Sequence, residues 1–82
     1  MDRPLTINMR SPVPSYQQLA DQLRDAITAG EIGPDEMLPS QRRMVQETGL
    51  GMSTVQRAVR VLIEEGLVVS VPGRGVFVAP QG

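Results

Sequence analysis

The sequence contains no cysteine and no histidine, and its only aromatic residues are one tyrosine and one phenylalanine. The lack of cysteine excludes a disulfide framework and a thiolate metal site. The lack of histidine removes the commonest general base and the commonest metal ligand of proteins. We therefore expect an aliphatic core and no metal or other cofactor.

A catalytic site is hard to assemble from the residues that remain. No loop has the glycine pattern that cradles phosphates, and Glu64 and Glu65 form a carboxylate pair only because they are adjacent in sequence. We expect these glutamates to be the solvated end of a helix. The protein is therefore predicted not to be an enzyme.

Long apolar runs are also absent. No run approaches the roughly 18 residues of a membrane span, and the N-terminus lacks the apolar segment of a signal peptide. We expect a cytoplasmic protein without membrane contact. Its 82 residues are enough for a single domain.

Lysine is missing too, so all eight basic residues are arginine. The net charge of −1 argues weakly against nucleic acid, but the charge is unevenly distributed. Residues 1–36 carry a net −3 and residues 37–82 a net +2. The exclusive use of arginine is explained either by codon choice in a GC-rich genome or by bidentate contacts to phosphate and guanine.

The first half of the chain reads as an arm followed by a helix. Residues 1–13 contain two prolines and few periodic apolar residues, which predicts a flexible N-terminal arm. A domain is expected over 14–79 and a tail over 80–82. Apolar residues then recur at helical spacing from Tyr16 to Ile27, and Gly30 suits the left-handed position after a helix. Gln17 and Gln18 are expected to face solvent.

Two further helices follow, over about Gln41–Thr48 and about Met52–Glu65. Ser40 is a good N-cap for the first of them, and Gly49 and Gly66 are expected to end them. Of the apolar residues in this region, the predicted core positions are Met44, Leu50, Val55, Val59, Leu62 and Ile63.

The pattern then changes to β-branched runs at 67–71 and 76–79, which flank the turn Pro72-Gly73-Arg74-Gly75. This predicts a β-hairpin. Met37-Leu38 reads as a short extended piece. The fold class is α+β and mainly helical: three helices, a short strand and a C-terminal hairpin, which is the winged helix-turn-helix arrangement.

The joint between the second and third helices is the three-residue stretch Gly49-Leu50-Gly51, which is typical of a helix-turn-helix. In that motif the second helix enters the major groove of DNA and its N-terminal residues meet base edges. An ordinary helical hairpin is the alternative. The residues left free for DNA at the start of the third helix are Gly51, Met52, Ser53, Thr54, Gln56 and Arg57.

Two other segments are expected to contact DNA. Arg42 and Arg43 lie in the first turn of a helix, where the dipole disfavours cations, so an external phosphate explains them better. We expect Arg42, beside Ser40, to be the contact and Arg43 to be solvated or salt-bridged. In the hairpin turn, Gly73, Arg74 and Gly75 suit a wing tip at the minor groove or a phosphate. A plain turn with one solvated arginine is the alternative.

Residues 13–79 resemble the DNA-binding domain of GntR-family bacterial transcription regulators. The most specific matches are "LPSQR" at 38–42, "STVQRAVRVLIEEGLV" at 53–68 and "PGRGVFV" at 72–78. The resemblance implies a repressor that binds double-stranded operator DNA as a homodimer, with Arg42 as a DNA contact. Two positions where the family often has arginine hold Met52 and Gln56, and Gly51 replaces the usual cap, which leaves the operator sequence open.

The family also carries a C-terminal effector and dimerisation domain, which the 82 residues do not include. We expect a cut-out domain, monomeric or weakly dimeric, whose small-molecule effector binds elsewhere; a minimal natural protein is the alternative. Residues 80–82 would then begin the linker. A winged helix that binds protein instead of DNA is the remaining alternative, supported by the net charge and by Met52 and Gln56.

Overall fold

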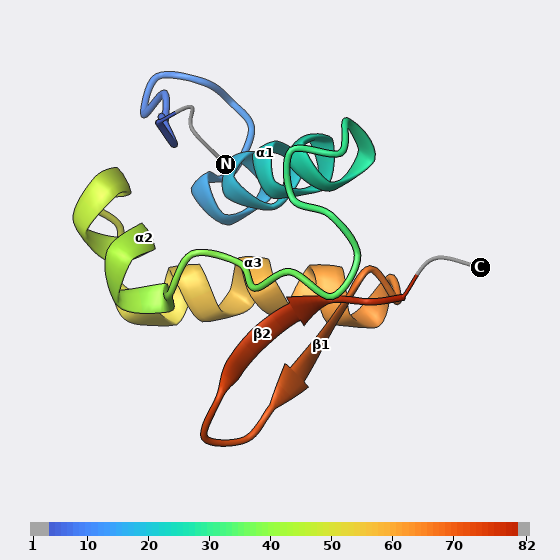
Figure 1. Ribbon diagram of the computed structural model, residues 1–82. Coiled ribbons are helices and arrows are strands. Elements are labelled where there is room, and N and C mark those ends of the chain that lie inside the picture. The colour runs from blue at the N-terminus through green and yellow to red at the C-terminus, as the bar shows by residue number, and fades with distance from the viewer. Residues whose placement is uncertain (1–3, 81–82) are drawn as a thin grey trace.

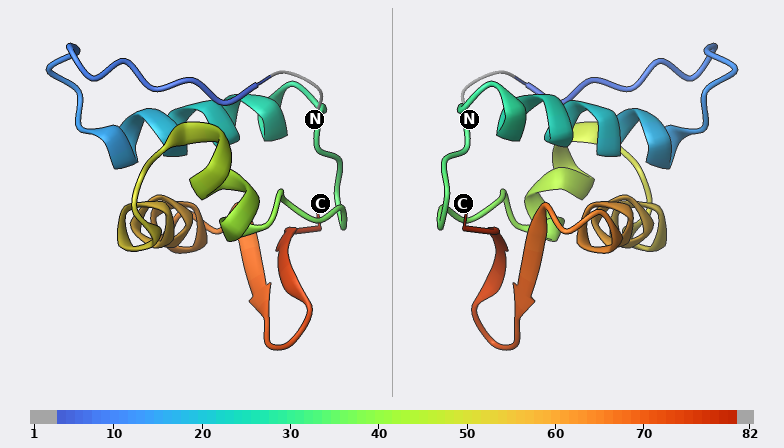
Figure 2. Two further views of the ribbon diagram at one scale, coloured as in Figure 1. Left: turned by 90° about the vertical axis from the view of Figure 1, so that its left-hand side faces the viewer. Right: turned by 90° about the vertical axis from the view of Figure 1, so that its right-hand side faces the viewer.

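Three helices and a two-stranded hairpin follow one another in the computed structural model, which describes residues 4–80 (Figure 1). This is the predicted winged helix-turn-helix architecture. Helix α1 lies across α3, α2 sits at one end of α3, and the hairpin extends away from the helices (Figure 2). The elements are α1 Ser15–Thr28, α2 Gln41–Thr48, α3 Met52–Glu64, β1 Val68–Val71 and β2 Gly75–Val78.

The core is aliphatic, as the composition predicts. Leu19 and Leu23 of α1 are fully buried against Val55 and Leu62 of α3. The prediction for Ile63 is wrong, because its side chain is 39% exposed. Ile63 lies about 100° around the helix from the fully buried Leu62, at the border of the buried stripe.

The joint between α2 and α3 has the predicted geometry. Ser40 caps α2, with its Oγ accepting a hydrogen bond from the backbone N–H of Arg43 at 3.0 Å. Gly49 ends α2 in the left-handed conformation, φ 75°, which a β-carbon would resist. Leu50 is 9% exposed and fills the space between the two helices. This joint therefore sets the position of the first residues of α3 relative to α2.

The hairpin is antiparallel, with Val68 opposite Val78 and Val71 opposite Gly75. Its loop therefore has three residues, one fewer than the predicted four. The expected extended piece at Met37-Leu38 runs beside β2: Met37 forms a bridge with Phe77, and the Leu38 N–H donates to the Val76 carbonyl at 2.8 Å. The segment before α2 is thus joined directly to the wing.

The prediction of a loose arm is wrong for the part of residues 1–13 that the structure describes. Leu5 is 3% exposed and belongs to the core. Gln22 accepts from the Thr6 N–H at 3.0 Å and donates to the Thr6 carbonyl at 2.6 Å. Gln18, expected to face solvent, binds both the N–H and the carbonyl of Asn8 at 2.9 Å. Residues 1–3, 81 and 82 lie outside the described residues.

Candidate nucleic-acid interface

The first turns of α3 present mostly polar side chains to solvent, and one buried residue attaches these turns to the core. Val55 is fully buried, whereas Met52 is 42% exposed, and Ser53 and Gln56 are also exposed. Gly51 provides the N-cap without a side-chain hydrogen bond. Within residues 4–80, the side chains of Ser53 and Gln56 make no hydrogen bond. Their donors and acceptors are therefore available to an external partner.

Arg57 differs from its neighbours on α3. Its guanidinium carbon lies 3.9 Å from the centroid of the Tyr16 ring in the first turn of α1. Tyr16 is half-buried and packs against the core. Among the residues of α3 that were predicted to contact DNA, Arg57 is thus directed toward α1. Thr54, another of these residues, is half-buried.

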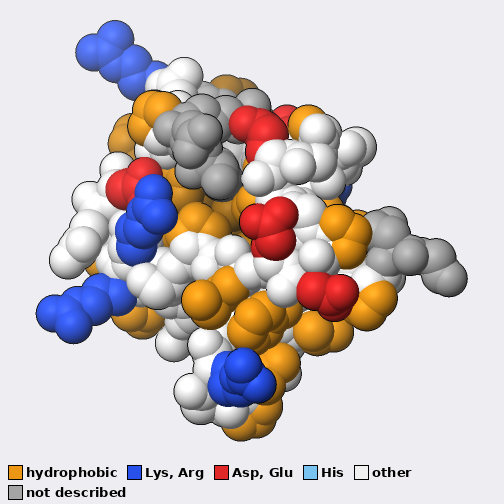
Figure 3. Space-filling view, in the orientation of Figure 1, with side chains coloured by type: hydrophobic (Ala, Val, Ile, Leu, Met, Phe, Trp, Pro, Cys, Tyr) orange, Lys and Arg blue, Asp and Glu red, His pale blue; other side chains and the backbone are white. Residues whose placement is uncertain are grey.

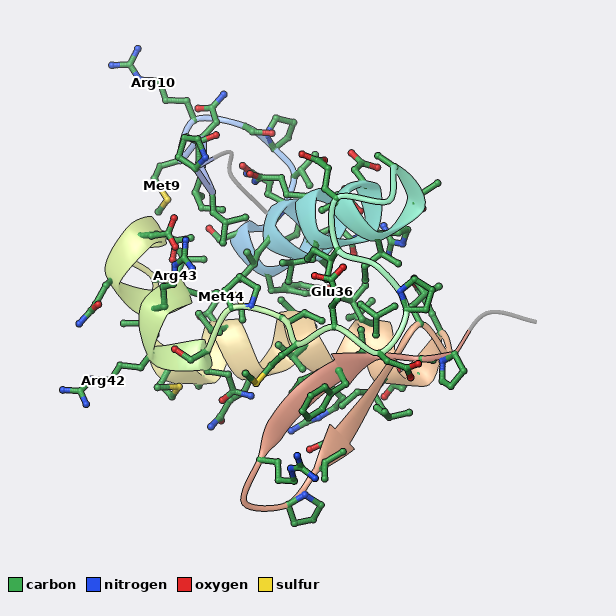
Figure 4. All side chains as sticks on the ribbon, viewed as in Figure 1. Met9, Arg10, Glu36, Arg42, Arg43 and Met44 are labelled. Carbon is green, nitrogen blue, oxygen red and sulfur yellow. The ribbon has the colours of Figure 1, made fainter. Side chains whose placement is uncertain are left out.

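The two arginines at the start of α2 have different surroundings. Arg43 Nε lies 2.8 Å from Glu47 Oε2, one turn along the helix, which is the salt bridge expected of one member of the pair. Arg42 has no ion pair or hydrogen bond from its side chain among the described residues. Its side chain extends away from the body of the protein (Figure 4). Arg42 is therefore the member of the pair that is free to meet an anion.

The hairpin turn displays Arg74 between two glycines with positive φ. Gly73 has φ 75° and Gly75 has φ 136°. The backbone conformation requires glycine at position 75, and a β-carbon there would also lie 2.8 Å from the sulfur of the exposed Met37 side chain, which would have to move. Arg74 is exposed, and its side chain makes no hydrogen bond or ion pair with residues 4–80.

The start of α2 and the wing border one hollow. Its volume is about 260 Å³, and Ser40 and Gln41 line it from one side and Arg74 and Gly75 from the other. Two of the three predicted contact segments therefore lie next to each other, and the third, the start of α3, is adjacent to α2 through the joint. The sequence assigned these segments separately, and the fold brings them to one side.

Charges are segregated on the surface even though the net charge is −1. In Figure 3, arginine side chains project from the left edge of the molecule and from the wing tip, and the acidic side chains visible on this face, apart from one beside the arginines at the left edge, lie over its middle and lower right. An anionic partner would therefore meet positive charge on the side that carries Arg42 and Arg74. Segregation of this kind explains how a protein with a slightly negative net charge can attract a polyanion.

Two acidic residues are held by an arginine away from this side. Arg24 of α1 binds Glu65 and also donates to Asp21 at 2.6 Å. These hydrogen bonds, first the one to Glu65, raise the pKa of Arg24 above its ordinary value. Hydrogen bonds from Gln17 and then from Arg24 lower the pKa of Asp21. The contact with Glu65 holds the end of α3 against α1, whereas the contacts of Asp21 lie within α1.

Two arginines outside the predicted set are also exposed. Arg60 lies one turn after Gln56 on the same side of α3, and its side chain has no hydrogen bond or ion pair with residues 4–80. Helical spacing from Ser53 and Gln56 could have identified it. Arg10, in the N-terminal segment, points away from the body of the protein (Figure 4). Its position depends on the packing of the N-terminal segment against α1, which no sequence motif predicts.

Neither a metal site nor a membrane-spanning element is found in the described part of the chain. Residues 4–80 contain no group of three or more acidic, histidine or cysteine side chains placed to hold a metal ion. None of their helices combines the length and apolarity needed to cross a membrane.

Comparison with known proteins gives one consistent family. The family model of the bacterial regulatory proteins of the gntR family matches residues 15–78. The HTH-type transcriptional repressor NagR of Bacillus subtilis is 41% identical over 75 residues, which cover 92% of this chain and 31% of NagR. The mannosyl-D-glycerate transport/metabolism system repressor MngR of Escherichia coli is 37% identical over 83% of this chain and 28% of its own length. The chain thus spans less than a third of either repressor.

Solved structures agree with the sequence comparison. YtrA from Sulfolobus acidocaldarius, a GntR-family transcription factor, superposes with a TM-score of 0.87 at 35% identity, over 98% of this chain and 84% of YtrA. The DNA-binding domain of AraR, crystallised in complex with operator ORX1, gives a TM-score of 0.85 at 30% identity, over 94% of this chain and 99% of that domain. The order of three helices and a wing is common to this chain and these structures.

Proposed function

The chain belongs to the GntR family of bacterial regulatory proteins, and we propose that this DNA-binding domain recognises a palindromic operator and represses transcription. Helix α3 enters the major groove, and the wing lies at the adjacent minor groove. The observation that carries the proposal is the arrangement of the start of α3, Arg42 and Arg74 on one side of the fold, with free polar groups.

The dimensions of α3 suit this role. Its 13 residues make a rod about 20 Å long, and the N-terminal half of a recognition helix is the part that meets base edges. Ser53 and Gln56 supply free hydrogen-bonding groups there. Arg42 and Arg74 act on the sugar-phosphate backbone to either side, where arginine fixes the register of the protein on the duplex.

The other residues predicted to contact DNA support the contacts of Ser53, Gln56, Arg42 and Arg74. Ser40 holds the first turn of α2 in place, and Arg43 supplies charge nearby while paired with Glu47. Gly51 and Gly73, where a β-carbon would meet no protein atom within 4 Å, let the backbone approach DNA closely, and Gly75, also in the predicted set, makes room for Met37 in the turn. Met52 and Thr54 complete the set of contacts. Arg57, also predicted as a contact, is directed toward Tyr16 of α1 instead.

The similarity to the operator-bound AraR domain and to two repressors supports the operator and the repression parts of the proposal. A palindromic operator requires a dimer, with half-sites about one helical turn apart. We propose that the full-length protein is a homodimer released from DNA by a small molecule bound outside these 82 residues.

The test is a titration of the isotope-labelled 82-residue chain with duplex DNA from its own promoter, with a scrambled duplex as the control. The expected result is a set of backbone amide shifts clustered at residues 40–43, 51–57 and 72–75, weaker at higher salt and weaker with the scrambled duplex. An absence of shifts at low salt would overturn the proposal and favour a protein partner instead.

Repression is tested separately with a reporter gene behind the same promoter. Deleting the gene of the full-length protein raises reporter expression if the protein is a repressor. A fall in expression on deletion contradicts repression and indicates an activator, without affecting the assignment of DNA binding.

A further inference from the structure

We infer that Arg57 is directed by its position on α3 toward Tyr16 of α1 and away from the bases, so that Gln56 and Met52 of α3 read adenine and thymine where an arginine would read guanine. The inference rests on the proposed function, because it assigns the base preference of a helix that enters the major groove. It names the specificity-determining residues of that helix.

Arg57 is the only arginine in the first two turns of α3. Arginine is the side chain that most commonly reads guanine, through its O6 and N7 atoms. The guanidinium of Arg57 instead stacks 3.9 Å above the Tyr16 ring, on the side of α3 that faces α1. The part of α3 that meets base edges therefore has no free arginine.

Helical position keeps Arg57 and Gln56 apart. Consecutive residues lie about 100° apart around a helix. Arg57 lines a hollow of about 320 Å³ beside α1, together with Tyr16, Arg60 and Glu64, whereas Gln56 does not border it. A cation–π contact at an exposed site is weaker than a bidentate contact to guanine, so it is the direction of the side chain, set by the helix, that decides.

Gln56 and Met52 form a neutral reading pair. They lie four residues apart on the same side of α3 and both are exposed. The Gln56 side-chain amide, free of hydrogen bonds within residues 4–80, can donate to adenine N7 and accept from adenine N6. Met52, 42% exposed, supplies an apolar contact for a thymine methyl group. Both preferences favour A·T base pairs.

The experiment is a selection of bound sequences from a randomised duplex library at low salt. The proteins are the wild-type chain and the variants Gln56→Arg, Gln56→Ala and Arg57→Ala. The wild type is expected to enrich adenine at one position, and replacing this adenine by guanine lowers affinity by roughly 5- to 150-fold. Gln56→Arg should convert the enriched base to guanine, Gln56→Ala should erase the preference, and Arg57→Ala should preserve it.

Two results would overturn the inference: Gln56→Ala leaving every base preference unchanged, or Arg57→Ala erasing a guanine preference. Failure of the proposed function is a different result, since the wild type would then retain no duplex at all. Tyr16→Leu adds a second test, because the direction of Arg57 is set by the helix: the variant should select the wild-type sequence, and guanine added to its selected sequence would also overturn the inference. Tyr16→Phe, which keeps the ring, is the matched control and should select the wild-type sequence. If Tyr16→Leu does not fold, the Gln56 and Arg57 variants still test whether Gln56 sets the base preference.

Discussion

The guanidinium of Arg24 in α1 donates to both carboxylate oxygens of Glu65, the residue that follows α3, at 2.9 and 2.8 Å. The pair joins positions 41 residues apart in sequence. It closes the C-terminal end of α3 onto α1, at the opposite end of α3 from the turns that are proposed to read DNA.

Arg24→Ala is expected to lower the free energy of unfolding by about 1 kcal/mol, the upper range for exposed pairs, because the geometry is bidentate. In a domain of this size the melting temperature falls by roughly 4–8 °C for each such loss. Urea denaturation of the double-mutant cycle Arg24→Ala with Glu65→Ala isolates the pair from the Asp21 contact. A coupling energy of zero would show that the pair contributes nothing to stability.

Asp21 makes stability depend on pH in the acidic range. Its pKa in the folded protein lies below the ordinary value of 3.8 because the carboxylate accepts hydrogen bonds from Gln17 and Arg24. The stabilisation is therefore fully present above pH 3.8 and is lost as the pH falls through the lowered folded-state value. Urea denaturation between about pH 2 and 6 should show this loss, and Asp21→Asn should reduce it. Asp25→Asn, a change at an exposed position on the same helix, is the control and should preserve it.

Arg42→Ala is expected to weaken binding to the operator while the fold stays intact, because Arg42 has no hydrogen bond or ion pair to lose among residues 4–80. Arg43→Ala is the matched control: it removes a neighbouring charge that is already paired with Glu47 and should weaken binding less. Fluorescence anisotropy with the operator duplex compares the two variants, and circular dichroism checks the fold. If Arg42→Ala unfolded the protein, its role would be structural.

Arg74→Ala is expected to weaken binding to all duplexes alike, since a wing residue on the phosphate backbone carries no sequence information. The slope of log affinity against log salt should become shallower by about one unit, which corresponds to one phosphate contact. Affinities for the operator and for a scrambled duplex, each measured at several salt concentrations, provide the check. A loss confined to the operator would mean that Arg74 reads bases.

The sequence predicted the elements that local signals define. Ser40, Gly49 and the change from helical spacing to β-branched runs after Gly66 place α2, α3 and the hairpin correctly, because capping and positive φ act within a few residues. The boundaries of α2 agree residue for residue with the prediction. The candidate contact segments follow from the same signals, since they lie at the starts of helices and at a turn.

What the sequence could not show depends on contacts between distant residues. The N-terminal segment is docked by side-chain amides of Gln18 and Gln22, which bind backbone 10 and 16 residues away and leave no motif. The stacking of Arg57 on Tyr16 also joins two elements, α1 and α3, whose crossing is set by the whole core. Ile63 was misplaced because spacing alone does not give the width of a buried stripe.

The hydrogen bond from Leu38 to Val76 has a consequence for the shape of the duplex. It ties the chain just before Ser40 to β2, so the start of α2, which carries Arg42, and the wing, which carries Arg74, are connected by backbone contacts and restrained relative to each other. If Arg42 and Arg74 contact phosphates as proposed, a restrained separation between them favours one spacing of phosphates across a groove. DNA whose groove must be widened or narrowed to fit then binds less tightly by the energy of that deformation, even at base pairs that no side chain touches.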